Sequence, residues 1–160
     1  MAPAKNPIPE GFRTVTAQLT LDDAAAAIEW YKRAFGAQEV SRSLGPDGKI
    51  MHADVTIGDT HIMLNDAMMG MKGPKGYGGS PASFWLYVED SEALFKRAIA
   101  AGATEQVPMG DQFWGDRAGA LGDPAGFSWW IATRKEDLKT EEIRARAEEM
   151  FKKMAGAAKS

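Results

Sequence analysis

The chain of 160 residues contains no cysteine and no strong excess of either charge. The lack of cysteine excludes a disulfide framework, a thiolate metal site and a cysteine nucleophile. A formal net charge of −3 argues against nucleic-acid binding, which usually requires a basic surface. No apolar run reaches the ~20 residues that a membrane-spanning helix needs. The N-terminal stretch MAPAKNPIPEG has several prolines and no apolar core, unlike a signal peptide, so we expect a soluble cytoplasmic protein with no membrane partner.

Two β-hairpins are predicted in the chain. Each follows a strand and a helix, so the chain consists of one structural unit that occurs twice. The first hairpin, Ile50–Asp66, turns on Gly58 and Asp59, a pair suited to a two-residue turn. The second lies within Asp111–Arg134, predicted to be two strands, and turns on the sequence DPAG at residues 123–126. Proline presets φ in such a turn and glycine tolerates positive φ.

In the first unit, a strand is predicted from Arg13 to Leu21, where apolar and polar residues alternate. The helix after it should begin at Asp22 or Asp23 and end at Gly36. The hairpin turn then determines which side chains share a face. The polar face carries His52, Asp54, Thr56, His61, Met63 and Asn65, and the apolar face carries Met51, Ala53, Val55, Ile57, Ile62 and Leu64. The apolar face should pack under the helix, so the polar face should line a wet cavity.

The same order of elements recurs after residues 68–81, which are too rich in glycine and proline for regular structure and are predicted to be a linker or flap. The second helix should run from about Ser91 to Gly102. In the last strand, Phe127, Trp129 and Ile131 should face the helix, and Ser128, Trp130 and Ala132 should face the polar side.

The chain is thus divided into a paired domain at residues 1–135 and a C-terminal amphipathic helix and tail at 136–160. The first unit covers about 12–67 and the second about 82–135. In the tail, an apolar stripe recurs at helical spacing. Its members are Ile143, Ala147, Met150, Phe151 and Met154. The stripe is predicted to pack on its own domain or, alternatively, on a second subunit.

A βαβββ unit that occurs twice, with DPAG before the last strand, resembles the vicinal oxygen chelate superfamily, which includes glyoxalases, bleomycin-resistance proteins and dioxygenases. Within it the chain is similar to the PhnB-like group. The segments that carry the resemblance are AIEWYKRAFGA, HADVTIGDTHIMLND, GGSP followed by LYVED, DQFWGDR, GDPAGFSWWIAT and KEDL. The resemblance implies an α+β fold in which two βαβββ modules form a concave mixed sheet, with helices on the outer face, around a ligand cavity that is often shared across a homodimer.

The metal-dependent members of this superfamily carry His or Glu at four positions. The resemblance places Thr16, Met63, Ser83 and Trp130 there, and a register shifted by two residues places Gln18, His61 or Asn65, and Trp85. Neither set suits a first-row metal, so no metal and no cofactor are expected.

The two histidines do not build another metal site, because His52 and His61 should lie roughly 13 Å apart along the strands. His52 is interpreted as a polar residue of the pocket wall. For His61, a hydrogen bond to Asp54 that orders the hairpin and a role as general base both remain open.

The predicted pocket face is unusually aromatic. Its residues are Trp85, Tyr87, Trp114, Trp130 and Met63, with Gln18, His52, Asp54, His61 and Asn65 as polar groups. Aromatic rings stack on planar ligands, but Trp85 and Trp130 filling the space between the modules is the competing interpretation. Asp116 and Arg117 are as well suited to an ion pair within their own loop as to ligand contact.

The sequence therefore favours a homodimeric protein that binds a small planar or aromatic molecule without a metal. The alternative is a glyoxalase- or dioxygenase-class enzyme, a lyase or isomerase with a non-standard metal or an acid–base site, so enzymatic activity stays open. A structural or regulatory dimer with a closed core is the third interpretation.

Overall fold

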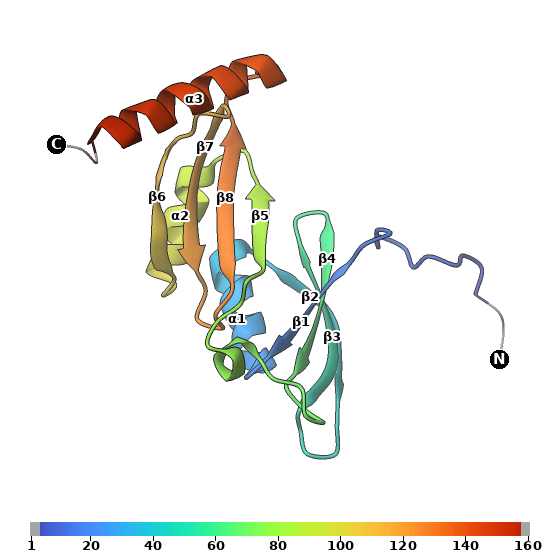
Figure 1. Ribbon diagram of the computed structural model, residues 1–160. Helices are drawn as coiled ribbons and strands as arrows, with labels where there is room; N and C mark the ends of the chain where they lie inside the picture. Colours follow the sequence, from blue (N-terminus) through green and yellow to red (C-terminus); the bar gives the residue numbers. More distant parts are fainter. Residues whose placement is uncertain (1–3, 158–160) are drawn as a thin grey trace.

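The computed structural model describes residues 4–157 and contains two four-stranded sheets, each with an α-helix from its own module, and a C-terminal helix (Figure 1). The elements are β1 (Ala17–Leu21), α1 (Ala24–Phe35), β2 (Gln38–Leu44), β3 (Ile50–Ile57), β4 (Thr60–Asp66), the 3₁₀ turn η1 (Pro74–Tyr77), β5 (Ser83–Tyr87), α2 (Ser91–Ala100), β6 (Thr104–Asp111), β7 (Asp116–Gly122), β8 (Ser128–Arg134) and α3 (Thr140–Ala157). Sheet A has the order β1-β4-β3-β2 and sheet B the order β5-β8-β7-β6. The predicted α+β fold of two βαβββ modules is confirmed.

The first module forms around α1 as its capping residues predict. Asp23 is the N-cap, and its side chain accepts a 2.8 Å hydrogen bond from the backbone N–H of Ala26. Gly36 ends the helix at φ 71°, a left-handed conformation that glycine adopts without strain. The apolar stripe of α1 is buried against both sheets, and the hairpin pairs Thr56 with His61 as predicted.

Two expectations for the first module are wrong. The strand begins at Ala17 and not at Arg13, and Val15 is 87% exposed. Ala17 pairs with Ile62, and β4 itself begins at Thr60, so the neighbouring strand offers almost no partner to the residues before Ala17. Met51, assigned to the apolar face, is 50% exposed, because the register shifts there: Ser43 pairs with His52 and Leu44 with Ile50, which leaves Met51 unpaired.

The second module places its tryptophans on opposite sides of β8. Trp129 is 1% exposed and faces the helices, whereas Trp130 is partly exposed on the other side of the strand. This confirms the predicted alternation, except that Ala132 on the face of Trp130 is fully buried. The segment 68–81 was expected to lack regular structure but contains η1. Asp111 belongs to the end of β6, so the second hairpin itself consists of β7 and β8.

The two modules share one core. The hydroxyl of Tyr31 in α1 donates to Asp123 Oδ2 at 2.8 Å, and the indole N–H of Trp30 donates to the carbonyl of Ala101 at 2.9 Å. From the other side, Arg97 Nε donates to the carbonyl of Ala34 at 2.7 Å. Helices α1 and α2 contact each other and lie behind sheet B in Figure 1. Each sheet therefore has one face toward these helices and one face away from them.

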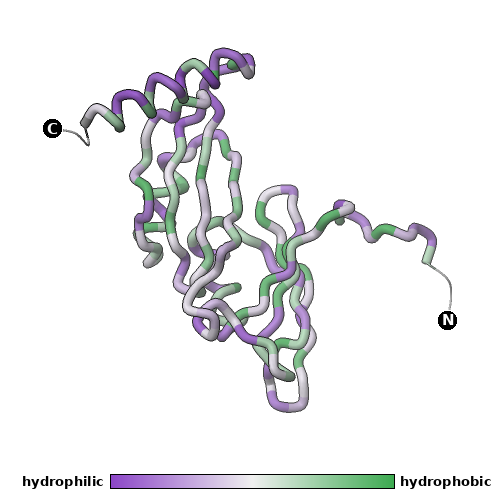
Figure 2. Tube along the Cα trace, viewed as in Figure 1, coloured by the Kyte–Doolittle hydropathy of each residue, from purple (hydrophilic) through white to green (hydrophobic). Residues whose placement is uncertain are grey.

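Helix α3 crosses one end of sheet B, beyond the strand termini (Figure 1). It is largely hydrophilic with scattered hydrophobic positions (Figure 2). Ile143 near its start is partly buried, whereas Phe151 and Met154 are 60% and 61% exposed. Only the first part of the predicted stripe therefore packs on its own domain. Within residues 4–157, no helix is long and apolar enough to cross a membrane.

Candidate functional site

The outer face of sheet B carries a cluster of four aromatic side chains, Trp85, Tyr87, Trp114 and Trp130, which we call the aromatic face. The rings of Trp85 and Trp130 are parallel, with their centroids 4.9 Å apart and an interplanar angle of 4°. Trp114 meets both of them edge-on, at 6.1 and 6.2 Å. Trp85 is 42% exposed, so part of its surface is open to a ligand. The strand register produces this stack, because Trp85 and Trp130 are direct partners in the parallel pair of β5 and β8.

Asp116 at the start of β7 holds two members of the aromatic face in place. Its Oδ2 accepts hydrogen bonds from the Tyr87 hydroxyl at 2.9 Å and from the Trp114 indole N–H at 2.8 Å. Desolvation of the Tyr87 hydroxyl and the neighbouring Asp116 carboxylate raise the pKa of Tyr87, so this phenol remains a donor at neutral pH. The next residue, Arg117, pairs instead with Glu92 and with Asp111, the latter at 3.0 Å. The expected ion pair within the loop therefore involves Arg117, not Asp116.

Beside this cluster lies a cavity of about 400 Å³, which we call the tail cavity. Its lining residues are Tyr87, Trp114, Asp116, Arg134, Leu138 and Ile143. The sequence analysis did not connect Leu138 or Ile143 with the site. The sequence pattern predicted the apolar stripe that contains Ile143, but it did not predict the position of α3 against the loop before β7.

The polar face of sheet A is more closed than predicted. Asp54 and Asn65 are 5% and 2% exposed and therefore do not line an open wet surface. Asn65 Oδ1 accepts a hydrogen bond from Gln18 Nε2 at 2.9 Å, and Asp54 pairs with His61 Nδ1 at 2.9 Å. Phe12 stacks on the His61 ring at a centroid distance of 4.4 Å. The hydrogen bond of His61 to Asp54 thus orders the hairpin, and only His52, Gln18 and part of Met63 and His61 remain open.

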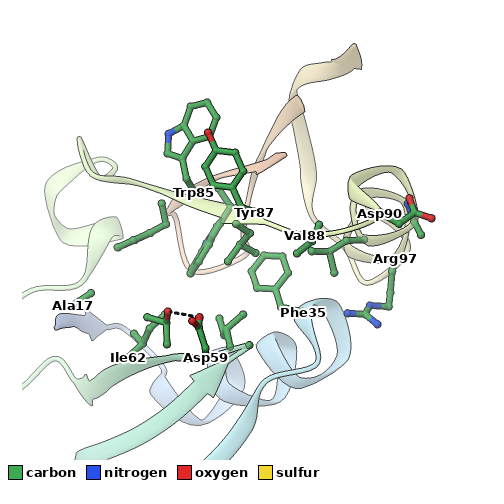
Figure 3. A pocket seen from close by; sticks show the side chains of 17 residues that line it. Ala17, Phe35, Asp59, Ile62, Trp85, Tyr87, Val88, Asp90 and Arg97 are labelled. Atoms are coloured by element: carbon green, nitrogen blue, oxygen red, sulfur yellow. Dashed lines mark hydrogen bonds between the residues drawn. The ribbon is translucent and has the colours of Figure 1, made fainter. Parts of the chain in front are cut away.

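A larger cavity, of about 780 Å³, lies between the two modules on the other side of β5. It is bounded by β5, by α2 and by the turn between β3 and β4, and β1 contributes Ala17. Figure 3 shows Phe35 projecting into it from α1. Trp85 and Tyr87 are among its lining residues, but their rings point away from it. This cavity, which we call the edge cleft, therefore shares β5 with the aromatic face.

The predicted site residues fall into two groups that one chain does not bring together. Trp85, Tyr87 and Trp130 lie on sheet B and Trp114 lies in the loop between β6 and β7, whereas Gln18, His52, Asp54, His61 and Met63 lie on sheet A. Both groups lie on the side of their sheet away from the helices, and the helices contact each other. The two faces therefore point outward and do not enclose a common cavity within the chain.

No three His, Asp or Glu side chains cluster as metal ligands anywhere in the described range 4–157. The positions that the family resemblance suggests for a metal site hold Thr16, Met63, Ser83 and Trp130, and of these side chains only the Met63 thioether is a soft ligand. The donor set present thus does not fit a divalent metal centre.

The fold is shared with known proteins. The family model described as Glyoxalase/Bleomycin resistance protein/Dioxygenase superfamily matches residues 13–131. The chain belongs to this superfamily. The superfamily's description covers both enzymes and resistance proteins, so membership does not decide whether this member is catalytic. The match ends before α3, so the tail cavity is walled in part by residues outside the region that defines the family.

A relative from Mycobacterium tuberculosis, the protein Rv0887c, is 42% identical over 132 residues, which cover 79% of this chain and 78% of the relative. Among solved structures, TioX from Micromonospora sp. ML1 is 25% identical with a TM-score of 0.61, and the match covers 79% of this chain and all of TioX (100%). A bleomycin-binding protein complexed with bleomycin is 20% identical with a TM-score of 0.56, covering 77% of this chain and 99% of that protein. At 20% identity, this last likeness shows a common fold.

Proposed function

We propose that the protein binds a small planar aromatic molecule on the aromatic face of sheet B without a metal ion. The observation that carries this proposal is the parallel stack of Trp85 on Trp130 with Trp114 set perpendicular to both. Three indole rings give a large, rigid contact surface at low entropic cost. Their partial exposure is unfavourable in water and suits a binding surface better than a core. A protein of the same fold that holds bleomycin supports the choice of a small-molecule ligand.

The binding cavity is completed by a second copy of the chain. The aromatic face has no opposing wall within its own chain, and the open part of sheet A is polar. Sheets A and B also each end in a free edge, β1 and β5, on either side of the apolar edge cleft. Unpaired edges of this kind are commonly covered by another chain, and twofold dimers are the most common closed assembly. In such a homodimer the polar face of sheet A, with Gln18, His52, His61 and Met63, lies opposite the partner's tryptophans.

The competing function is an enzyme of the glyoxalase or dioxygenase class. It is favoured by the His61–Asp54 pair, whose geometry suits a general base oriented by a carboxylate. However, Phe12 covers the His61 ring, and the donor set does not fit a metal. Elemental analysis separates the two functions, because one Zn, Ni, Mn or Fe ion per purified chain would favour the enzyme.

Replacing Trp130 by alanine is expected to weaken binding of a planar aromatic ligand by about 1–3 kcal/mol, or roughly 5- to 150-fold in Kd. The physical reason is the loss of the ring that supports Trp85 from behind. Calorimetric titration measures the effect directly, after a screen for quenching of tryptophan fluorescence has found a ligand. Tyr77→Ala serves as the control, because Tyr77 is 72% exposed on η1, away from the aromatic face. Equal losses in the two variants would contradict the proposed site.

Light scattering at micromolar concentration should give twice the mass of one 17.3 kDa chain. Thr60→Arg should shift this mass toward the monomer, because Thr60 is exposed in the single chain but lines the edge cleft. Thr104→Arg is the matched control, since Thr104 is equally exposed but lies in β6, at the far edge of sheet B. A wild-type mass of one chain would refute the homodimer.

A further inference from the structure

The tail cavity is lined by a buried carboxylate, and one of its two oxygens accepts no hydrogen bond from the described residues. Asp116 is 5% exposed, and both of its side-chain hydrogen bonds, from Tyr87 and from Trp114, end on Oδ2. No donor within residues 4–157 reaches the second oxygen, Oδ1, and the residue lines the cavity. A carboxylate accepts hydrogen bonds at both oxygens. No fully buried side-chain nitrogen or oxygen within residues 4–157 lacks a partner, so Oδ1 is accessible from the cavity. This accessible oxygen suits a ligand group that is a donor or a cation.

The other walls of the tail cavity suit a cation on an apolar arm. Tyr87 and Trp114 present aromatic rings, whose faces attract ammonium groups. Leu138 and Ile143 close the cavity with aliphatic side chains. One positive charge, Arg134, also lines it, but its guanidinium is paired with Asp137 at 2.9 Å. Arg134 is the cross-strand neighbour of Asp116 but forms its salt bridge with Asp137, so among the described residues no cation is paired with the Asp116 carboxylate.

The tail is fixed in place by specific contacts, so the cavity is a built feature of the fold. The backbone N–H groups of Lys135 and Glu136 both donate to the carbonyl of Gly115, at 2.9 and 3.0 Å. Gly115 has a φ of 96°, and a Cβ there would lie 3.1 Å from both the Glu136 carbonyl oxygen and Leu138 Cδ1. The chain can therefore cross this loop only at a glycine. Arg146 then anchors α3 through a two-pronged ion pair with Glu136, both N–O distances being 2.8 Å.

We infer that the tail cavity is a subsite for an organic cation, a protonated amine or a methylated ammonium, carried on the ligand whose ring stacks on Trp85. Asp116 supplies the charge, Tyr87 and Trp114 supply the aromatic walls, and α3 supplies the closing side. The distances between ring centroids connect the two regions, since Trp85 lies 6.0 Å from Tyr87 and 6.1 Å from Trp114. This inference rests on the proposed function and adds to it the chemical class of the ligand and a role for the C-terminal helix.

Two probes of the same shape test the subsite. Benzyltrimethylammonium carries a ring and a cation, and neopentylbenzene is its uncharged carbon isostere. The wild-type full-length protein should bind the charged probe about tenfold more tightly, because only the cation gains from the carboxylate and the aromatic walls. Asp116→Asn should reduce the ratio of the two affinities to about one. Asp111→Asn is the matched control, since Asp111 ends β6 just before the same loop but its carboxylate is 82% exposed and faces Arg117.

A second variant leaves Asp116 and its two hydrogen bonds untouched. Ile143→Lys places a positive charge at the wall of the cavity and should lower the affinity for benzyltrimethylammonium about tenfold, whereas Met154→Lys on the exposed end of α3 should not. Equal affinity of the wild-type protein for the two probes, or no effect of Ile143→Lys, would overturn the cationic subsite. Either result leaves the effect of Trp130→Ala on neutral aromatic ligands as a separate test of the proposed function.

Discussion

Replacing Trp129 by alanine is expected to lower the free energy of unfolding by about 3–5 kcal/mol, the cost of a large-to-small change in a packed core. Trp129 is 1% exposed, and its ring lies 4.9 Å from that of Phe35 and 4.8 Å from that of Phe84. Its indole N–H also donates to Asp123 at 2.8 Å. The substitution therefore removes packing between α1 and sheet B and breaks a buried hydrogen bond at the same time.

Urea denaturation followed by circular dichroism measures this loss, and Trp130→Ala supplies the control. The two residues are neighbours of the same type on one strand, but Trp130 is partly exposed on the aromatic face. Trp130→Ala should therefore cost well under half as much stability while weakening ligand binding. Similar midpoints for the two variants would contradict the assignment of their faces, on which the proposed site depends.

The alternation of side chains along β8 assigned Trp129 and Trp130 to opposite faces of the strand. This assignment was reliable because the two-residue period of a strand and the position of the turn lead to the same faces. The two-residue turn at Gly58-Asp59 determined the register of the first hairpin, and the pair Thr56 with His61 follows from it. In the second module the DPAG turn placed Trp130 on the face that carries Trp85. These are local rules, and a side chain's face is a local property. The paired modules and the faces of β8 could therefore be predicted from the sequence.

Exposure is a different property, because it depends on what distant residues cover. Alternation put Asn65 on the polar face correctly, yet Gln18 from another strand pairs with it and it is buried. His61 is covered by Phe12, which reaches it from the N-terminal arm. Neither contact has a signature in the sequence, so the openness of sheet A could not be predicted.

The tail cavity escaped prediction for the same reason. For Asp116 the sequence left open an ion pair within its own loop and contact with a ligand, because its neighbour Arg117 offered a nearby charge. Its partner Tyr87 lies on another strand, and Ile143 reaches the cavity because the segment that precedes α3 packs against Gly115. A helix beyond the repeated modules has no counterpart within the repeat, so the internal symmetry that revealed the rest of the fold gave no position for it.

Replacing Asp123 by alanine should destabilise the protein about as strongly as the loss of Trp129, by about 3–5 kcal/mol. The carboxylate, 7% exposed, accepts four hydrogen bonds from buried groups. Oδ1 accepts from the backbone N–H groups of Gly126 and Phe127, and Oδ2 accepts from the Tyr31 hydroxyl and the Trp129 indole. Alanine leaves three of these donors without an acceptor, whereas the Gly126 N–H keeps the Asp123 backbone carbonyl at 3.1 Å. An unpaired buried donor costs more than its hydrogen bond is worth. Because Tyr31 belongs to the first module, the same change also loosens the contact between modules.

The matched control for this prediction is Asp23→Ala, which removes a carboxylate with a single hydrogen bond at the exposed N-cap of α1 and should cost about 1 kcal/mol.

The pH dependence of stability gives a second measurement. Burial and the Asp123 carboxylate raise the pKa of Tyr31 well above its ordinary value. Folding therefore favours the neutral phenol, and its contribution is complete below pH about 10 and is lost as the pH rises through the folded pKa. Denaturation above pH 10 should show this decline in the wild type, and Tyr31→Phe should abolish it while lowering stability at neutral pH. Two results would contradict the role of the Asp123 hydrogen bonds in joining the two modules. One is a wild-type free energy of unfolding that does not change at alkaline pH, and the other is an Asp123→Ala variant that is as stable as Asp23→Ala.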